Sequence, residues 1–241
     1  MKCFSLIIRP GSVRVIWLFP LVFCQGVLLE AQHVDIRDGN LYYADARGNS
    51  KQITSSGMDL DPSLSFDGKT VIFVRRTLVP ARFEEHTDPQ PKQRQIWVAK
   101  VGGPTDPEIV LGGPVVLKDF SEYVSFASPK LSPDNRYAYF RIPVGVTESG
   151  LVRVDLRTKV TSLVCYGTGY DIVPSGKYAG DLVVQMRKSL GDAVPGGGFS
   201  AFFWLLTPEG KELGFVGESD EDAQRFLRSR NRSLGRDPLI R

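Results

Sequence analysis

The chain has 241 residues, of which 42% are hydrophobic and 24% are charged, and it carries a formal net charge of +3. This composition is that of an ordinary globular chain, so it excludes wholesale disorder, a collagen-like fibre and a polytopic membrane protein. Lys2, Arg9 and Arg14 precede the first acid, Glu30, and leave 27 basic residues against 27 acidic ones in the rest of the chain. A basic, nucleic-acid-binding domain is therefore not indicated.

Residues 1–26 are predicted to be a signal peptide. Positive charges are followed by the apolar run Val15–Phe23, which is short for a transmembrane helix of about 20 residues. Cleavage is expected after Gly26 or Ala31. An uncleaved anchor and a lipidated Cys24, in a sequence that resembles a bacterial lipobox, are alternatives. We therefore expect an exported protein of the periplasm or cell envelope, either lipid-anchored or secreted in the alternative cases.

Cys165 is then the single cysteine of the mature chain, because Cys3 and Cys24 fall within or next to the signal. An internal disulfide is excluded on this interpretation. We expect Cys165 to be a small buried side chain in a strand at Thr161–Cys165.

Residues 33–217 contain short apolar or alternating runs separated by turn residues, which is typical of consecutive β-hairpins. Two segments, Pro62–Phe73 and Pro129–Phe140, share the pattern P-x-L-S-x-D-[GN]-[KR]-x-[VA]-x-F. A degraded third copy is found at Tyr170–Lys177, where Ser175 replaces the aspartate. The pattern predicts an all-β domain built from repeats.

Each motif contains a predicted tight turn. A serine and an aspartate are expected to cap this turn through side-chain to backbone hydrogen bonds, and a glycine or asparagine to adopt its left-handed conformation. The repeat-motif turn residues are Ser65, Asp67, Gly68, Ser132, Asp134 and Asn135.

A second kind of hairpin alternates with the first. Its leading strands contain Tyr42, Trp97, Val152 and Trp204, which are separated by 55, 55 and 52 residues. The predicted return strands are Lys51–Thr54, Glu108–Leu111, Val160–Val164 and Lys211–Val216. Each period then holds four strands, which is the content of one propeller blade.

The motif resembles the PD40, or WD40-like, repeat of the TolB family and of the propellers of prolyl-oligopeptidase-type enzymes. The resemblance covers residues 34–217 and implies an all-β, β-propeller-like fold with three full four-stranded blades plus a partial N-terminal blade. Propellers of this family close with roughly six to eight blades. Three arrangements stay open here: a compact four-bladed ring, which we prefer, completion by a second chain, and a partial propeller used as a docking module.

The repeats carry two insertions and a tail. Residues 79–95 are predicted to form a surface loop, and Gly191–Gly198 a flexible connection. Residues 218–241 are acidic and then arginine-rich, with a short helix at Ala223–Arg228. Such a tail is solvated or makes weak contact with anionic lipid. The arginines assigned to that contact are Arg225, Arg228, Arg230 and Arg232.

The sequence offers no catalytic, cofactor-binding or metal-binding motif. His33 and His86 lack a metal-ligand spacing, and Gly-x-Ser-x-Gly is absent. We therefore expect a non-enzymatic, exported scaffold that binds proteins of the bacterial cell envelope, with self-association to complete the propeller as a further possibility. The alternative is a propeller whose central pocket binds a small ligand or glycan, or acts as a lyase.

Overall fold

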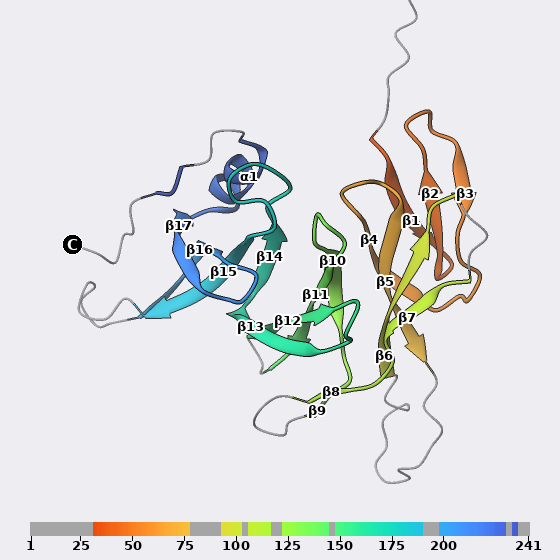
Figure 1. Cartoon of the computed structure of the whole chain (residues 1–241), viewed down its shortest axis with the longest axis horizontal. Coiled ribbons are helices and arrows are strands. Elements are labelled where there is room, and N and C mark those ends of the chain that lie inside the picture. The colour runs from red at the N-terminus through yellow and green to blue at the C-terminus, as the bar shows by residue number, and fades with distance from the viewer. Residues whose placement is uncertain are drawn as a thin grey trace, which may run out of the picture.

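The computed structural model describes residues 31–77, 93–102, 106–116, 122–144, 148–189, 198–229 and 233–235. Within these ranges the chain forms four antiparallel sheets whose strands pair in chain order, a small separate hairpin and one helix. Figure 1 shows that the sheets succeed one another across the molecule, with the first and the fourth at opposite ends.

The sheets are bounded as follows. The first contains β1 (His33–Arg37), β2 (Asn40–Ala44) and β3 (Ser50–Gln52). The second contains β4 (Asp59–Leu64), β5 (Thr70–Thr77), β6 (Gln93–Lys100) and β7 (Glu108–Leu111). The third contains β10 (Ala127–Leu131), β11 (Tyr137–Pro143), β12 (Ser149–Asp155) and β13 (Thr161–Gly167). The fourth contains β14 (Gly169–Ile172), β15 (Leu182–Ser189), β16 (Phe199–Leu206) and β17 (Glu212–Gly217).

The remaining elements are β8 (Val115–Val116) and β9 (Glu122–Tyr123), which pair between the second and third sheets, and the helix α1 (Asp220–Arg228). The predicted all-β fold with a short C-terminal helix is confirmed. Tyr42, Trp97, Val152 and Trp204 lie in β2, β6, β12 and β16, so the first sheet lacks only the counterpart of β4, β10 and β14.

The sheets pack face to face through alternate residues of their strands. Val71 and Phe73 of β5 pack with Leu41 of the first sheet, whereas Ile72 on the opposite face of β5 packs with Phe140 of the third. This division follows from the two-residue period of a strand. Tyr139, Leu151, Leu182 and Trp204 continue the core between the third and fourth sheets.

The two outermost sheets do not present bare apolar faces to solvent. Ala223 and Phe226 of α1 pack on Val183 and Leu205, on the outer face of the fourth sheet. On the outer face of the first sheet, Tyr42 lies among polar groups. Its hydroxyl donates to Gln52 Oε1 at 3.1 Å, and the Arg37 guanidinium lies over its ring. In the described part of the chain the first and fourth sheets lie apart in an open array (Figure 1), so the compact ring that we preferred is not confirmed.

Two predicted boundaries differ from those of the structure, and other predicted segments lie outside the described residues. The loop predicted at 79–95 ends earlier, because Gln93–Gln95 pair with β5 as part of β6; its residues 79–92 lie outside the described residues. The helix begins at Asp220 instead of Ala223, since Ser219 forms a capping box with Asp222. The signal at 1–26 and most of Gly191–Gly198 also lie outside the described residues.

Candidate functional site

The meander gives the array two different ends. Antiparallel neighbours place the turns that follow the first and third strands of a sheet at one end, and all other connections at the opposite end. We call these the turn end (residues 65–69, 132–136, 155–160 and 207–211) and the loop end (residues 38–39, 53–58, 112–116, 122–126, 144, 148 and 167–168). The first sheet fits this scheme, because Gly39 C=O accepts from the Asp59 N–H at 2.8 Å.

The motif turns of the turn end have matching hydrogen bonds. Ser65 Oγ donates to Asp67 Oδ1 at 2.6 Å and accepts from the Thr70 N–H at 2.9 Å. In the next copy, Ser132 Oγ donates to Asp134 Oδ1 at 2.5 Å and accepts from the Tyr137 N–H at 2.9 Å. Gly68 and Asn135 occupy the left-handed position of these turns, with φ of 70° and 54°.

These bonds stabilise the charged form of the two aspartates. The hydrogen bond from Ser65 lowers the pKa of Asp67, and the hydrogen bond from Ser132 lowers the pKa of Asp134. The serines and aspartates of the motif therefore have a structural role within their own turns, whereas Asn135 Oδ1 is buried without a hydrogen-bond partner among the described residues.

The first strands of neighbouring sheets are joined by side-chain hydrogen bonds that the sequence pattern does not predict. The Ser128 N–H donates to Asp61 Oδ2 at 3.3 Å, and the Tyr170 hydroxyl donates to the Ser128 C=O at 2.6 Å. Lys130 and Asp171 form an ion pair beside them. Asp61 and Ser128 share a positive φ at equivalent bulges of β4 and β10. Hydrogen bonds therefore link the second sheet to the third and the third to the fourth.

The loop end is where large apolar side chains gather at the surface. Six large apolar residues at or beside the strand ends there are exposed. The complete set among the described residues is Ile36, Met58, Val116, Val124, Tyr166 and Phe199. The turn end exposes Phe66, Ile109, Val160 and Leu213. These residues are distributed over the four sheets and the β8–β9 hairpin, and they make the loop end the more apolar of the two ends.

A cavity of about 350 Å³ opens at the loop end between the first and second sheets. Gly39 and Gly57 lie close to each other on one side of the cavity, and Met58, Leu60 and Arg76 lie on the other. Asp59 is buried beside it and accepts two bonds from the Arg75 guanidinium, at 2.6 and 3.0 Å. The negative charge of Asp59 is therefore compensated by Arg75.

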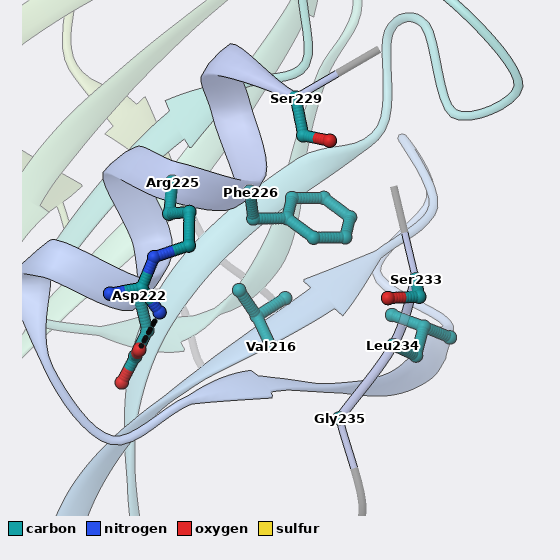
Figure 2. Close-up of a pocket in the computed structure, with 8 residues that line it drawn as sticks. All are labelled: Val216, Asp222, Arg225, Phe226, Ser229, Ser233, Leu234 and Gly235. Carbon is teal, nitrogen blue, oxygen red and sulfur yellow. Dashed lines mark hydrogen bonds and ion pairs between the residues drawn. The ribbon is translucent and has the colours of Figure 1, made fainter. Parts of the chain in front are cut away.

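Figure 2 shows a second cavity, of about 260 Å³, against α1. Val216, Phe226 and Leu234 surround the opening, and Arg225 turns to Asp222 with an Nη1 to Oδ1 distance of 2.9 Å. Asp222 also belongs to the helix cap, so the charge of Arg225 is compensated. Polar and apolar side chains both line the cavity, and residues 233–235 form one of its walls, with the Gly235 N–H donating to the Phe215 C=O at 2.8 Å.

The lipid contact assigned to four arginines stays a prediction. Arg225 and Arg228 lie on α1, whereas Arg230 and Arg232 lie outside the described residues. Because Arg225 is paired with Asp222, Arg228 is the more available of the two described cations.

A third cavity, of about 240 Å³, separates the third and fourth sheets at the turn end, with Pro133, Tyr137 and Pro208 among its walls. Burial, with Glu209 nearby, raises the pKa of Asp181 to about 6. Glu209 is held by Arg153 at 2.9 Å. Asp181 follows Ala179 and Gly180, which line the crevice, and the Ser132 hydroxyl in its wall is bonded to Asp134 and to the Tyr137 N–H.

The described residues offer little for catalysis. Burial raises the pKa of Cys165 to about 12, so its thiol stays protonated at neutral pH. His33 lies 3.4 Å from Asp35, and His86 is not among the described residues. Within the described ranges, His, Cys, Asp and Glu side chains form no group of three that could hold a metal ion. None of the helices in these ranges is long and apolar enough to cross a membrane.

No protein-family model and no curated protein matches the chain. Among solved structures, TolB from Acinetobacter baumannii is 18% identical, over 75% of this chain and 38% of that one, with a TM-score of 0.47. Oligogalacturonate lyase from Vibrio parahaemolyticus is 11% identical, over 76% and 47%, with a TM-score of 0.45. The β-propeller domain of the Trilobed protease from Pyrococcus furiosus is 15% identical, over 72% and 47%, with a TM-score of 0.42. The chain spans less than half the length of each.

The class of the protein follows from its own sheets. Consecutive four-stranded antiparallel meanders, packed face to face, are the arrangement of propeller blades. The fold is therefore mainly β and propeller-like. Membership of the PD40 repeat family stays a prediction, because it rests on the motif alone.

Proposed function

We propose that the protein is a non-enzymatic interaction scaffold and that the loop end is the face that meets its partner. The observation that carries this proposal is the contrast between the two ends. Six large apolar side chains, Val116, Val124 and Phe199 among them, are exposed at the loop end and four at the turn end, where the Ser65 and Ser132 hydroxyls are bonded within their own turns.

Rigidity supports the proposal. The Asp61–Ser128 and Ser128–Tyr170 hydrogen bonds fix successive sheets relative to one another. A preorganised surface loses little conformational entropy on binding, so its exposed apolar groups contribute to affinity more fully. Helix α1 covers the outer face of the fourth sheet, and polar groups surround Tyr42 on the first. These outer faces favour a partial propeller that serves as a docking module over a propeller completed by a second copy of the chain.

We also propose that the protein is exported and works in the bacterial cell envelope, with an envelope protein as partner. The support is the charge and hydropathy of residues 1–26. Subcellular fractionation, with N-terminal sequencing of the mature chain, tests the location. Recovery of the full-length chain in the cytoplasmic fraction contradicts export.

The interaction is tested by affinity capture from an envelope extract with matched surface variants. The loop-end variant carries Val116→Asp and Val124→Asp, and the turn-end variant carries Phe66→Asp and Val160→Asp. All four wild-type side chains are exposed, so both variants should fold. We expect the loop-end variant to lose a partner that the turn-end variant retains. Equal recovery by both variants contradicts the proposal.

A further inference from the structure

Two arginines lie directly opposite each other at the loop end of the second sheet. Arg76 of β5 and Arg94 of β6 are Cα partners in the strand register. Directly opposite residues project from the same face, with Cβ atoms about 4.5–5.5 Å apart. The two cationic side chains therefore leave the sheet side by side.

Apolar residues extend this pair on both sides. The Arg76 N–H donates to the Met58 C=O, and the Arg94 N–H donates to the Val124 C=O, each at 3.0 Å. Met58 is 38% exposed and Val124 is 40% exposed. We call Met58, Arg76, Arg94 and Val124 the basic row.

The positive charge of the basic row is not compensated within the described residues. Arg94 Nη1 donates to the neutral Phe126 C=O at 3.0 Å, and neither Arg76 nor Arg94 has an ion pair there. The neighbouring Arg75, in contrast, is held by both oxygens of Asp59. Like charges directly opposite each other destabilise a sheet, so the pair has a cost to the isolated fold.

The cavity beside the basic row adds a place for an apolar side chain. Met58, Leu60 and Arg76 all line this space of about 350 Å³. Methionine adapts to the shape of what it contacts, because its side chain is flexible and polarisable. Arginine binds carboxylates in a bidentate manner, so each of the two guanidinium groups suits one carboxylate.

We infer that the basic row binds an acidic segment of a partner polypeptide in which carboxylates alternate with apolar side chains. The carboxylates pair with Arg76 and Arg94, and one apolar side chain enters the cavity beside Met58. The inference deepens the proposed function, on which it rests, by giving the chemistry of the partner.

Binding of capped peptides to the full mature chain, followed by NMR or calorimetry, tests the inference. The probe is acetyl-Leu-Glu-Leu-Glu-amide and its neutral control is acetyl-Leu-Gln-Leu-Gln-amide. We expect the glutamine peptide to bind at least about tenfold more weakly, and added salt to remove most of the difference. Equal affinities for the two peptides overturn the inference.

Variants locate the binding. Arg76→Gln should abolish the preference for the glutamate peptide, whereas Arg157→Gln, an exposed arginine at the turn end, should leave it intact. Exchanging both Arg76 and Arg94 for glutamate should reverse the preference towards acetyl-Leu-Lys-Leu-Lys-amide, which a merely unfolded variant cannot do. Equal effects of Arg76→Gln and Arg157→Gln contradict a site at the basic row.

The chain's own acids are a competing source of carboxylate. A variant with Glu84→Gln and Glu85→Gln should bind the glutamate peptide as the wild type does. Tighter binding by that variant overturns the assignment to a partner. If the peptides fail while the loop-end variant still loses its captured partner, the acidic chemistry is wrong and the scaffold proposal stands; if capture also fails, both are wrong.

Discussion

Asn135 in the β10–β11 turn donates a hydrogen bond from Nδ2 to Asp67 Oδ2 in the β4–β5 turn, over 3.3 Å. The two residues are 68 positions apart and belong to neighbouring sheets. Equivalent turns of successive repeats are thus joined, and each turn residue stabilises both its own hairpin and the contact with the next sheet.

Ser132→Ala should destabilise the protein by about 1–2 kcal/mol. The change leaves the Tyr137 N–H without its acceptor at a position where Ser132 is only 3% exposed. Urea unfolding followed by circular dichroism measures the effect. Thr158→Ala, which removes an exposed 3.4 Å bond to the Val160 N–H, is the control and should cost less than about 0.5 kcal/mol. Equal losses contradict the role of the motif serine.

Asp181→Asn should stabilise the protein above pH 6. Burial raises the pKa of Asp181 from 3.8 to about 6, so the native state holds a proton that the unfolded state releases between these values. Stability therefore falls as pH rises through this window, and the penalty persists above it. Because the group is partly exposed, we expect about 1 kcal/mol, well below the roughly 3 kcal/mol of a fully buried group.

The difference in free energy of unfolding between Asp181→Asn and the wild type, measured from pH 3.5 to 8, checks this prediction. The difference should grow from pH 4 to 6 and then stay constant. A difference that does not change with pH would mean that the Asp181 carboxyl does not titrate abnormally.

Phe226→Ala should release α1 from the fourth sheet. Phe226 is 6% exposed and stacks on Tyr178, with ring centroids 6.2 Å apart. Loss of this contact should cost about 3 kcal/mol and expose Val183 and Leu205 beneath the helix. Chemical unfolding and analytical ultracentrifugation should record lower stability and self-association. Arg228→Ala, on the exposed side of the helix, should do neither, and a monomeric, fully stable Phe226→Ala contradicts the role of α1 as a cap.

Arg76→Gln should leave the isolated protein as stable as the wild type or more stable by a few tenths of a kcal/mol. The change removes one of two like charges that lie directly opposite each other. Thermal unfolding at low salt measures the effect, and 0.5 M salt should reduce it. A marked loss of stability would indicate that Arg76 has a structural partner.

The local features of the repeat could be predicted from the sequence because they depend on neighbouring residues. The hairpin containing Ser132 and Asp134 is an example, since its hydrogen bonds span five residues. The contact between Arg76 and Arg94 could not, because the two are separated by an insertion and become neighbours only through the register of β5 and β6. The sequence left open whether the sheets close into a ring for a similar reason, as α1 packs on the fourth sheet through long-range apolar contacts of Phe226.

The central claim is that the loop end of an open array is the surface that binds the partner. Hydrogen exchange with mass spectrometry, with and without the partner captured from envelope extract, tests it most directly. With the partner bound, we expect slower exchange at residues 36–40, 56–60 and 93–95 and at β8–β9. The exchange rates of the motif turns at 65–69 and 132–136 should not change. Protection confined to those motif turns, with an unchanged loop end, would contradict it.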